Sequence, residues 1–142
     1  MPDGEPGGSV SGHESPLVFV AFADDDAAWT NGYLIPALGL AQGEVITPHD
    51  FPPGARLLDA LEHAVLEARL TVLVLSEAFL HDVWTDFVEM LATHAELIDL
   101  RNRVVPLVRT PVALPLRLDW RVHLDCTRPE SWAGEVARLR SL

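Results

Sequence analysis

The apolar residues of this chain form short unbroken runs that alternate with segments of helical spacing. Leu70-Thr71-Val72-Leu73-Val74-Leu75 is rich in β-branched residues and has the length of a strand covered on both faces, as in a parallel sheet. Runs of the same kind predict further strands at 17–22, 44–47, 103–108 and 121–125. Apolar residues three and four apart predict helices at about 27–41, 57–68, 82–98 and 129–139.

The strands and helices alternate along the chain, except for a proline-rich connection before the last strand. This order predicts an α/β fold, a flavodoxin-like three-layer sandwich whose five parallel strands are arranged 2-1-3-4-5 with helices on both faces. One acid of the run Asp24-Asp25-Asp26 is expected to cap the first helix, and Gly43 is a plausible stop. Pro36 falls inside that helix and should kink or split it.

Composition narrows the class of protein. The 142 residues are one domain's worth of chain, and the net charge of -11 disfavours nucleic acid and anionic membrane surfaces as partners. All basic residues are Arg, so Schiff-base and P-loop lysine chemistry are excluded. Residues 1–16 resemble a disordered tail rather than a signal peptide, which leaves 17–142 as the domain. With no apolar run long enough to span a bilayer and a single cysteine, the sequence predicts a soluble, cytoplasmic domain.

Familiar catalytic and metal-binding motifs are missing from the chain. No metal site is predicted, because His63 and Glu67 lack a third ligand. Cys126, just after the last strand, is better explained as a small buried hydrophobe than as a nucleophile.

The remaining candidate is a cleft at the carboxyl edge of the sheet. In a parallel sheet the loops after the first three strands meet there, at 22–26, 49–56 and 76–84. These loops carry aromatic rings, one Arg and several carboxylates, a combination that suits a nucleotide. For Trp84, which begins an apolar helical stripe, a place in the core is the stronger interpretation. The candidate binding residues are Phe22, Ala23, Asp24, Trp29, Phe51, Arg56, Ser76 and Trp84.

From Leu17 to the last helix the motifs resemble those of a TIR domain (Toll/interleukin-1 receptor homology), of the bacterial type. Phe19-Val20-Ala21-Phe22-Ala23, with Asp26 and Trp29 after it, resembles the family's first strand and the D and W that follow. Asp50-Phe51-Pro52-Pro53-Gly54 resembles the BB loop, with its acid, Pro and Gly before a helix. The family's other motifs are matched by Leu73-Val74-Leu75-Ser76, Phe79, Trp84, Val105-Pro106-Leu107 and Trp132.

The resemblance implies the fold already predicted and one of two activities. Many TIR domains of signalling and defence proteins, bacterial and plant ones included, cleave NAD+ at the nicotinamide–ribose bond or cyclise its ADP-ribose, so NAD+ would be a substrate and not a cofactor. In those enzymes a glutamate four residues after the helix Trp carries the reaction. Here that position is Val88, and Glu89 is adjacent. One residue along a helix rotates a side chain by roughly 100°, so Glu89 is either the catalytic residue of a locally rewound turn or a solvated carboxylate.

The second activity is assembly with other TIR domains through the BB loop, here Asp50, Phe51, Pro52, Pro53 and Gly54, without turnover of NAD+. A third hypothesis is a receiver-like phospho-acceptor using Asp24 and Asp25. It ranks last because the chain has no Lys to pair with the phosphate.

Overall fold

The computed structural model describes residues 17–86, 103–113 and 123–141. Its five strands pair in parallel in the order β3-β2-β4-β5-β6, which confirms the predicted 2-1-3-4-5 arrangement. The predicted tail at 1–16 and most of the predicted helix at 82–98 lie outside the described residues. The strands are β2 (Val18–Ala21), β3 (Val45–Ile46), β4 (Leu70–Leu75), β5 (Arg103–Val108) and β6 (Leu124–Asp125).

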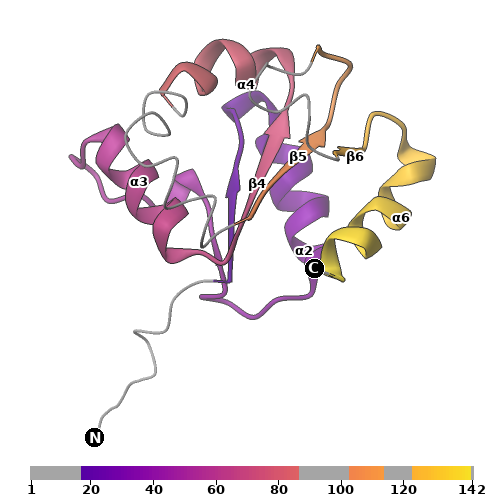
Figure 1. Ribbon diagram of the computed structural model, residues 1–142, viewed down its shortest axis with the longest axis horizontal. Helices are drawn as coiled ribbons and strands as arrows, with labels where there is room; N and C mark the ends of the chain where they lie inside the picture. The colour runs from indigo at the N-terminus through magenta and orange to yellow at the C-terminus, as the bar shows by residue number, and fades with distance from the viewer. Residues whose placement is uncertain (1–16, 87–102, 114–122, 142) are drawn as a thin grey trace, which may run out of the picture.

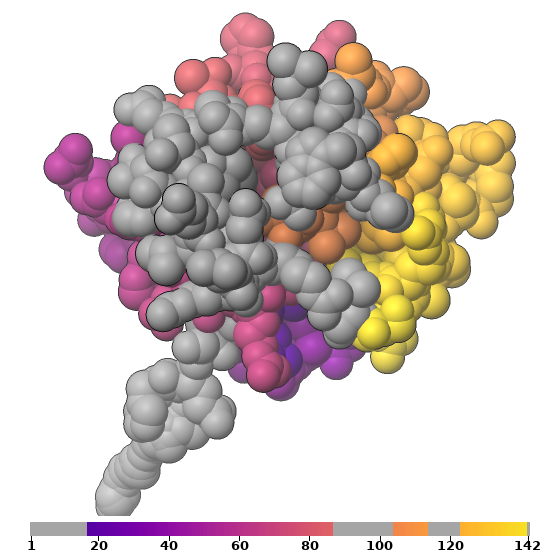
Figure 2. Space-filling view, in the orientation of Figure 1, coloured from indigo at the N-terminus to yellow at the C-terminus, as the bar shows by residue number. Residues whose placement is uncertain are grey.

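Helices cover both faces of this sheet, and each face has its own apolar core. On one face α3 (Leu57–Glu67) and α4 (Glu77–Asp82) pack on the odd-numbered side chains of β2 and β4. On the other, α2 (Ile35–Leu38) and α6 (Pro129–Arg140) pack on their even-numbered side chains. Figure 1 shows the resulting three layers, and in Figure 2 α3 and α6 form opposite flanks of the molecule. Both faces of the central strands are buried, as their continuous apolar runs predict.

The first helical segment is divided in the way that Pro36 predicts. It begins as a 3-10 turn, η1 (Asp24–Asp26), and α1 (Ala27–Trp29). A π-helical turn, η2 (Thr30–Leu34), then leads into α2, with the Ile35 amide donating to the Thr30 carbonyl. Proline has no N–H for the usual bond to the fourth residue before it, and a widened turn accommodates that loss without breaking the helix.

Two expectations about the ends of this helix are wrong. The helix stops at Gly39, in a left-handed conformation with φ of 68°, and not at Gly43. A left-handed residue after the last turn is the usual end of a helix, and glycine adopts it without steric penalty. At the other end, no side chain of the acid run makes a capping hydrogen bond.

The strand registers bring the functional loops to one edge. Ala21 is opposite Leu73, and Leu75 is opposite Val108, so the segments after β2, β4 and β5 begin at neighbouring positions. The turn after β3 belongs to the same edge because Phe19 is opposite Ile46. Within the described part of the chain, no helix is long and apolar enough to cross a membrane.

Candidate functional site

A buried hydrogen bond joins the ends of β2 and β4. The Ser76 hydroxyl donates to the Asp26 carboxylate (Oγ to Oδ2, 2.5 Å) and accepts from the Phe79 amide at 3.1 Å, which caps α4. Asp26 is 7% exposed and Ser76 is 4% exposed. We call Asp26 and Ser76 the polar junction. Because a buried carboxylate needs a donor, this pair fixes the loop after β2 against the start of α4.

The polar junction explains why the acid run does not cap the first helix. The Asp26 side chain is directed to Ser76, while Asp24 and Asp25 are exposed. A hydrogen bond that crosses the sheet edge replaces the local cap expected from the sequence. The loop after β2 therefore presents two carboxylates to solvent, those of Asp24 and Asp25.

The loop after β3 covers the end of β2. A 3-10 turn, η3 (Pro48–Asp50), is held by a reciprocal capping box in which Thr47 accepts from the His49 amide at 3.3 Å and Asp50 accepts from the Thr47 amide at 2.9 Å. This turn places the His49 ring edge-on to Phe22, with centroids 5.3 Å apart. His49 Nε2 also lies 4.0 Å from an Asp24 carboxylate oxygen. Phe22 is only 3% exposed, and it also belongs to the buried core on the α2 and α6 face.

A cluster of rings surrounds an arginine at the ends of β5 and β6. We call Trp29, Tyr33, Trp132 and Arg109 the aromatic box. The Arg109 guanidinium carbon lies 4.8 Å from the Trp29 ring centroid and 5.1 Å from that of Trp132. Tyr33 completes the cluster at 4.9 Å from Trp132 and 5.8 Å from Trp29. These distances are those of cation–π contacts, which hold the guanidinium in a defined place.

The backbone carbonyl of Cys126 connects this box to β6. It accepts from Trp132 Nε1 at 2.9 Å and from Arg109 at 3.5 Å. Burial raises the pKa of the Cys126 thiol to about 11, with smaller contributions from the Glu135 and Asp125 carboxylates. The thiol is fully buried and neutral at physiological pH, which agrees with its predicted role as a small hydrophobe.

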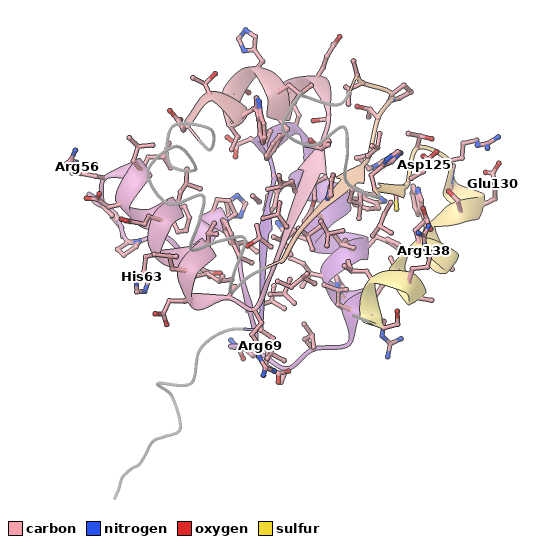
Figure 3. The ribbon with its side chains drawn as sticks, in the orientation of Figure 1. Arg56, His63, Arg69, Asp125, Glu130 and Arg138 are labelled. Atoms are coloured by element: carbon pink, nitrogen blue, oxygen red, sulfur yellow. The ribbon has the colours of Figure 1, made fainter. Side chains whose placement is uncertain are left out.

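The neighbouring Asp125 accepts hydrogen bonds from the Thr127 hydroxyl at 2.7 Å and the Thr127 amide at 3.0 Å. These bonds hold the pKa of Asp125 below its ordinary value, with a weaker contribution from Arg128. Asp125 remains an exposed carboxylate on the flank of α6, as Figure 3 shows.

The structure gathers some of the predicted site residues and separates others. Phe22, Ala23, Asp24 and Ser76 lie together at the carboxyl edge around β2 and β4. Trp29 belongs to the aromatic box, so its ring faces β5 and β6. Arg56 precedes α3 at the opposite flank from Asp125, with its side chain 82% exposed and 3.8 Å from Asp59 (Figure 3).

The remaining predicted residues lie in the core or outside the described part. Phe51 packs against Phe19 with ring centroids 6.0 Å apart, and Trp84 packs against Phe79 at 6.5 Å. Both are partly buried against the core on the α3 and α4 face, which is the place favoured for Trp84 from the sequence. Glu89 and Val88 lie outside the described residues, so the structure tests neither as the catalytic position.

Sequence reasoning missed three residues of this edge: Asp26 as the partner of Ser76, His49, and Arg109. A signal for Arg109 was present, because it is a charged residue directly after a predicted buried strand. The same argument selected Ser76 after β4. No local pattern marks the pairing of Asp26 with Ser76, which are 50 residues apart.

Charge is distributed unequally along this edge. The β2 end carries exposed carboxylates, the middle is the uncharged Ser76 with its buried Asp26 partner, and the β5 end carries the Arg109 cation. An edge of this kind can bind a molecule that has hydrogen-bond donors or a cation at one end and an anion at the other. Among the described residues, no group of His, Cys, Asp and Glu side chains is arranged to hold a metal ion.

Comparisons with known proteins show the same architecture. A family model described as the TIR domain matches residues 18–140. A 72-residue segment is 35% identical to Toll-like receptor 13 of Mus musculus, and this segment covers 46% of the chain but only 7% of that receptor. The chain therefore corresponds to a small part of that receptor's length.

Solved TIR domains superpose on the chain at low identity, which shows the fold alone. The TIR domain of the Toll-related receptor TRR-2 from Hydra magnipapillata matches with a TM-score of 0.66 at 20% identity, over 86% of this chain and 93% of that one. The RPS4 and RRS1 TIR domain heterodimer gives 0.56 at 19% identity, over 89% and 94%. The TIR domains of the activated Roq1 resistosome give 0.50 at 23% identity, over 66% and 57%.

Proposed function

Because this chain belongs to the TIR domain family, we propose that it cleaves NAD+ at the nicotinamide–ribose bond when several copies assemble. The reaction adds water at C1′ of the ribose, breaks the bond to nicotinamide, and releases nicotinamide, ADP-ribose and a proton. The observation that supports this proposal is the carboxyl edge itself, where carboxylates, a covered aromatic ring and a guanidinium follow one another across adjacent strands.

Each part of that edge has a role in the proposed reaction. Departure of nicotinamide leaves positive charge on the ribose, which a nearby carboxylate stabilises. Glu89 is assigned this role, as the acid next to the family's glutamate position. Phe22, with Ala23 and Asp24 beside it, borders the base, and the polar junction holds the β2 loop in place. His49 lies on Phe22, so the β3 loop must move before a base can reach that ring.

Nicotinamide release tests the proposal. Concentrated or crowded protein is incubated with NAD+, and nicotinamide is followed by chromatography. We expect release that rises more steeply than protein concentration, and loss of at least about a hundredfold in Glu89→Gln, the range of a removed electrostatic contact. Glu130→Gln is the matched control, since Glu130 is an exposed carboxylate in the first turn of α6. No release from any assembled form contradicts the proposal.

A double variant tests the register of the catalytic helix. Val88→Glu combined with Glu89→Gln moves the carboxylate to the position that the family uses. If Glu89 acts directly, this double variant stays inactive. If Glu89→Gln alone retains activity, then Glu89 is a solvated carboxylate and the assigned role is wrong.

The second function is a non-catalytic scaffold of a signalling or defence protein that binds other TIR domains through the BB loop. Val88 at the glutamate position favours it, as do the exposed Pro52, Pro53 and Gly54. Gly54 has φ of 84°, and a Cβ there would meet nothing within 4 Å, so the loop tip is open to a partner. Association by analytical ultracentrifugation should weaken in Pro53→His. Gly54→Arg should weaken it as well, with Gly54→Ala as the control for backbone strain alone.

A further inference from the structure

Arg109 is a cation at the carboxyl edge, held where it can meet an anionic ligand. We infer that its guanidinium binds a phosphate of the dinucleotide substrate, an inference that rests on the proposed NAD+ cleavage and adds a binding residue to it. Among the residues that the structure describes, no carboxylate forms an ion pair with Arg109. Its charge is matched by the faces of two tryptophans and one backbone carbonyl.

The position of Arg109 is fixed against the rest of the candidate site. Its amide donates to the Leu75 carbonyl at 2.9 Å, so its backbone adjoins the residue before Ser76. Ser76 in turn holds Asp26, and Trp29, one turn of helix later, lies against the Arg109 guanidinium. Asp26, Ser76, Arg109 and Trp29 therefore form one continuous unit across β2, β4 and β5.

The aromatic box leaves most of the guanidinium donors unused. Arginine has five N–H donors in a planar fork that matches two phosphate oxygens. Within the described part of the chain, its one hydrogen-bond acceptor is the Cys126 carbonyl, at the long distance of 3.5 Å. Arg109 is only half-buried, so it is open to solvent as well as held in place. A guanidinium that is already positioned loses less conformational entropy when it binds an anion.

Three other arginines whose side chains are described, Arg56, Arg69 and Arg138, are placed less well for this role. Arg69 lies between α3 and β4 at the amino edge of the sheet, as Figure 3 shows, and Arg138 pairs with Glu135 at 2.8 Å. Arg56, which the sequence suggested for the phosphates, pairs with Asp59 on α3. None of these three described side chains makes a cation–π contact with Trp29 or Trp132 like that of Arg109.

The charge layout also gives the substrate a direction. The nicotinamide ring of NAD+ is cationic, and its ribose hydroxyls are donors, so this end matches Asp24 and Asp25 at the end of β2. The pyrophosphate is anionic and matches Arg109 at the end of β5. The opposite direction places phosphates against the exposed acids, where like charges repel.

The test compares Arg109→Gln, Arg109→Lys, Arg56→Gln and Arg69→Gln in two assays. The first is the KM for NAD+ in nicotinamide release, and the second is the Kd for ADP-ribose by isothermal titration calorimetry. We expect Arg109→Gln to raise both by about tenfold or more, the effect of losing a charge-assisted hydrogen bond, and to raise KM more than it lowers kcat. Arg109→Lys should fall between, because lysine keeps the charge but not the planar fork. Arg69→Gln, the matched loss of a remote charge, should bind like the wild type.

The outcomes separate this inference from the proposed function. If wild-type protein cleaves NAD+ and Arg109→Gln keeps the wild-type KM, the phosphate contact is wrong and the reaction stands. If no assembled form cleaves NAD+ but ADP-ribose binds with the expected dependence on Arg109, the reaction is wrong and the phosphate site stands. Absence of ADP-ribose binding by the wild type overturns the inference. Should Arg109→Gln fail to fold, Arg109→Lys decides, since a wild-type Kd in that variant overturns the inference too.

Discussion

The polar junction and the aromatic box lie at the same edge of one sheet, but different kinds of interaction stabilise them. In the polar junction a single short hydrogen bond joins two side chains that are at least nine-tenths buried. In the aromatic box three rings and a guanidinium share many weak contacts, and each member is half-buried. The junction connects β2 to α4, while the box connects α1 to β5, β6 and α6.

This difference predicts how each region responds to change. A buried carboxylate with one side-chain donor is strongly destabilised when that donor is removed, because desolvation is then uncompensated. A ring cluster loses energy in proportion to the contacts removed, since dispersion and cation–π terms are spread over several partners. We therefore expect the polar junction to be rigid. We expect the aromatic box to keep its structure when Arg109 also binds a ligand.

Ser76→Ala should produce the largest loss of stability among single-atom changes at this edge. It leaves the Asp26 carboxylate without its donor and removes the cap on the Phe79 amide. Together these effects should lower the free energy of unfolding by about 3 kcal/mol. Urea denaturation followed by circular dichroism measures it.

The matched control for that variant is Asp26→Asn combined with Ser76→Ala. If the loss comes from an unpaired buried charge, neutralising Asp26 should restore part of it. A Ser76→Ala loss below about 1 kcal/mol, the cost of a helix cap alone, would mean that water solvates the carboxylate and that the junction is no more rigid than the box.

The fold was predictable because its signals are local and repeated. Five apolar runs with helices between them allow few arrangements, and the parallel order follows from the alternation. Helix ends were less predictable, since Gly39 and Gly43 are both plausible stops and Leu40 continues the apolar pattern. The π-helical turn before Pro36 changes the phase of the helix, which a regular period of 3.6 residues does not anticipate.

The candidate site was predictable only in its location. The rule that loops meet at the carboxyl edge selected Phe22, Asp24 and Ser76 correctly as neighbours of that edge. Which side chains touch there depends on strand registers and on rotamers, and these leave no periodic trace in the sequence. The sequence therefore predicts only a local cap for the acid run that contains Asp26, and it does not mark Arg109 as part of the same edge.

Alkaline pH should weaken the aromatic box region selectively through Cys126. Burial raises the thiol pKa from 9.0 to about 11, so the folded state holds its proton more tightly than the unfolded state. Stability is then full below about pH 9 and falls as the pH rises through 11, by about 3 kcal/mol in total. The chain contains no Lys and one Tyr, so few other groups titrate in this range.

Chemical denaturation at pH 8 and at pH 10.5 measures this effect, with Cys126→Ala as the comparison. The variant should lose most of the pH dependence while keeping its fold, because alanine does not ionise. An equal fall in both proteins would mean that the thiol has no part in the alkaline loss of stability.

The smallest effect distinguishes two tryptophans of the same box. Trp132 Nε1 donates to the Cys126 carbonyl at 2.9 Å, whereas buried Trp29 Nε1 has no hydrogen-bond partner among the described residues. Both rings contact Arg109, so replacement by phenylalanine removes a similar cation–π contribution from each. Only Trp132→Phe also removes a hydrogen bond, which should make it about 1 kcal/mol more destabilising than Trp29→Phe. Thermal unfolding of the two variants gives the difference in their loss of stability. A larger loss in Trp132→Phe means that the hydrogen bond to the Cys126 carbonyl contributes to the stability of the aromatic box. If Trp29→Phe were the more destabilising, the aromatic box would be held chiefly by ring packing on α1. Its stability would then not depend on a single hydrogen bond, unlike that of the polar junction.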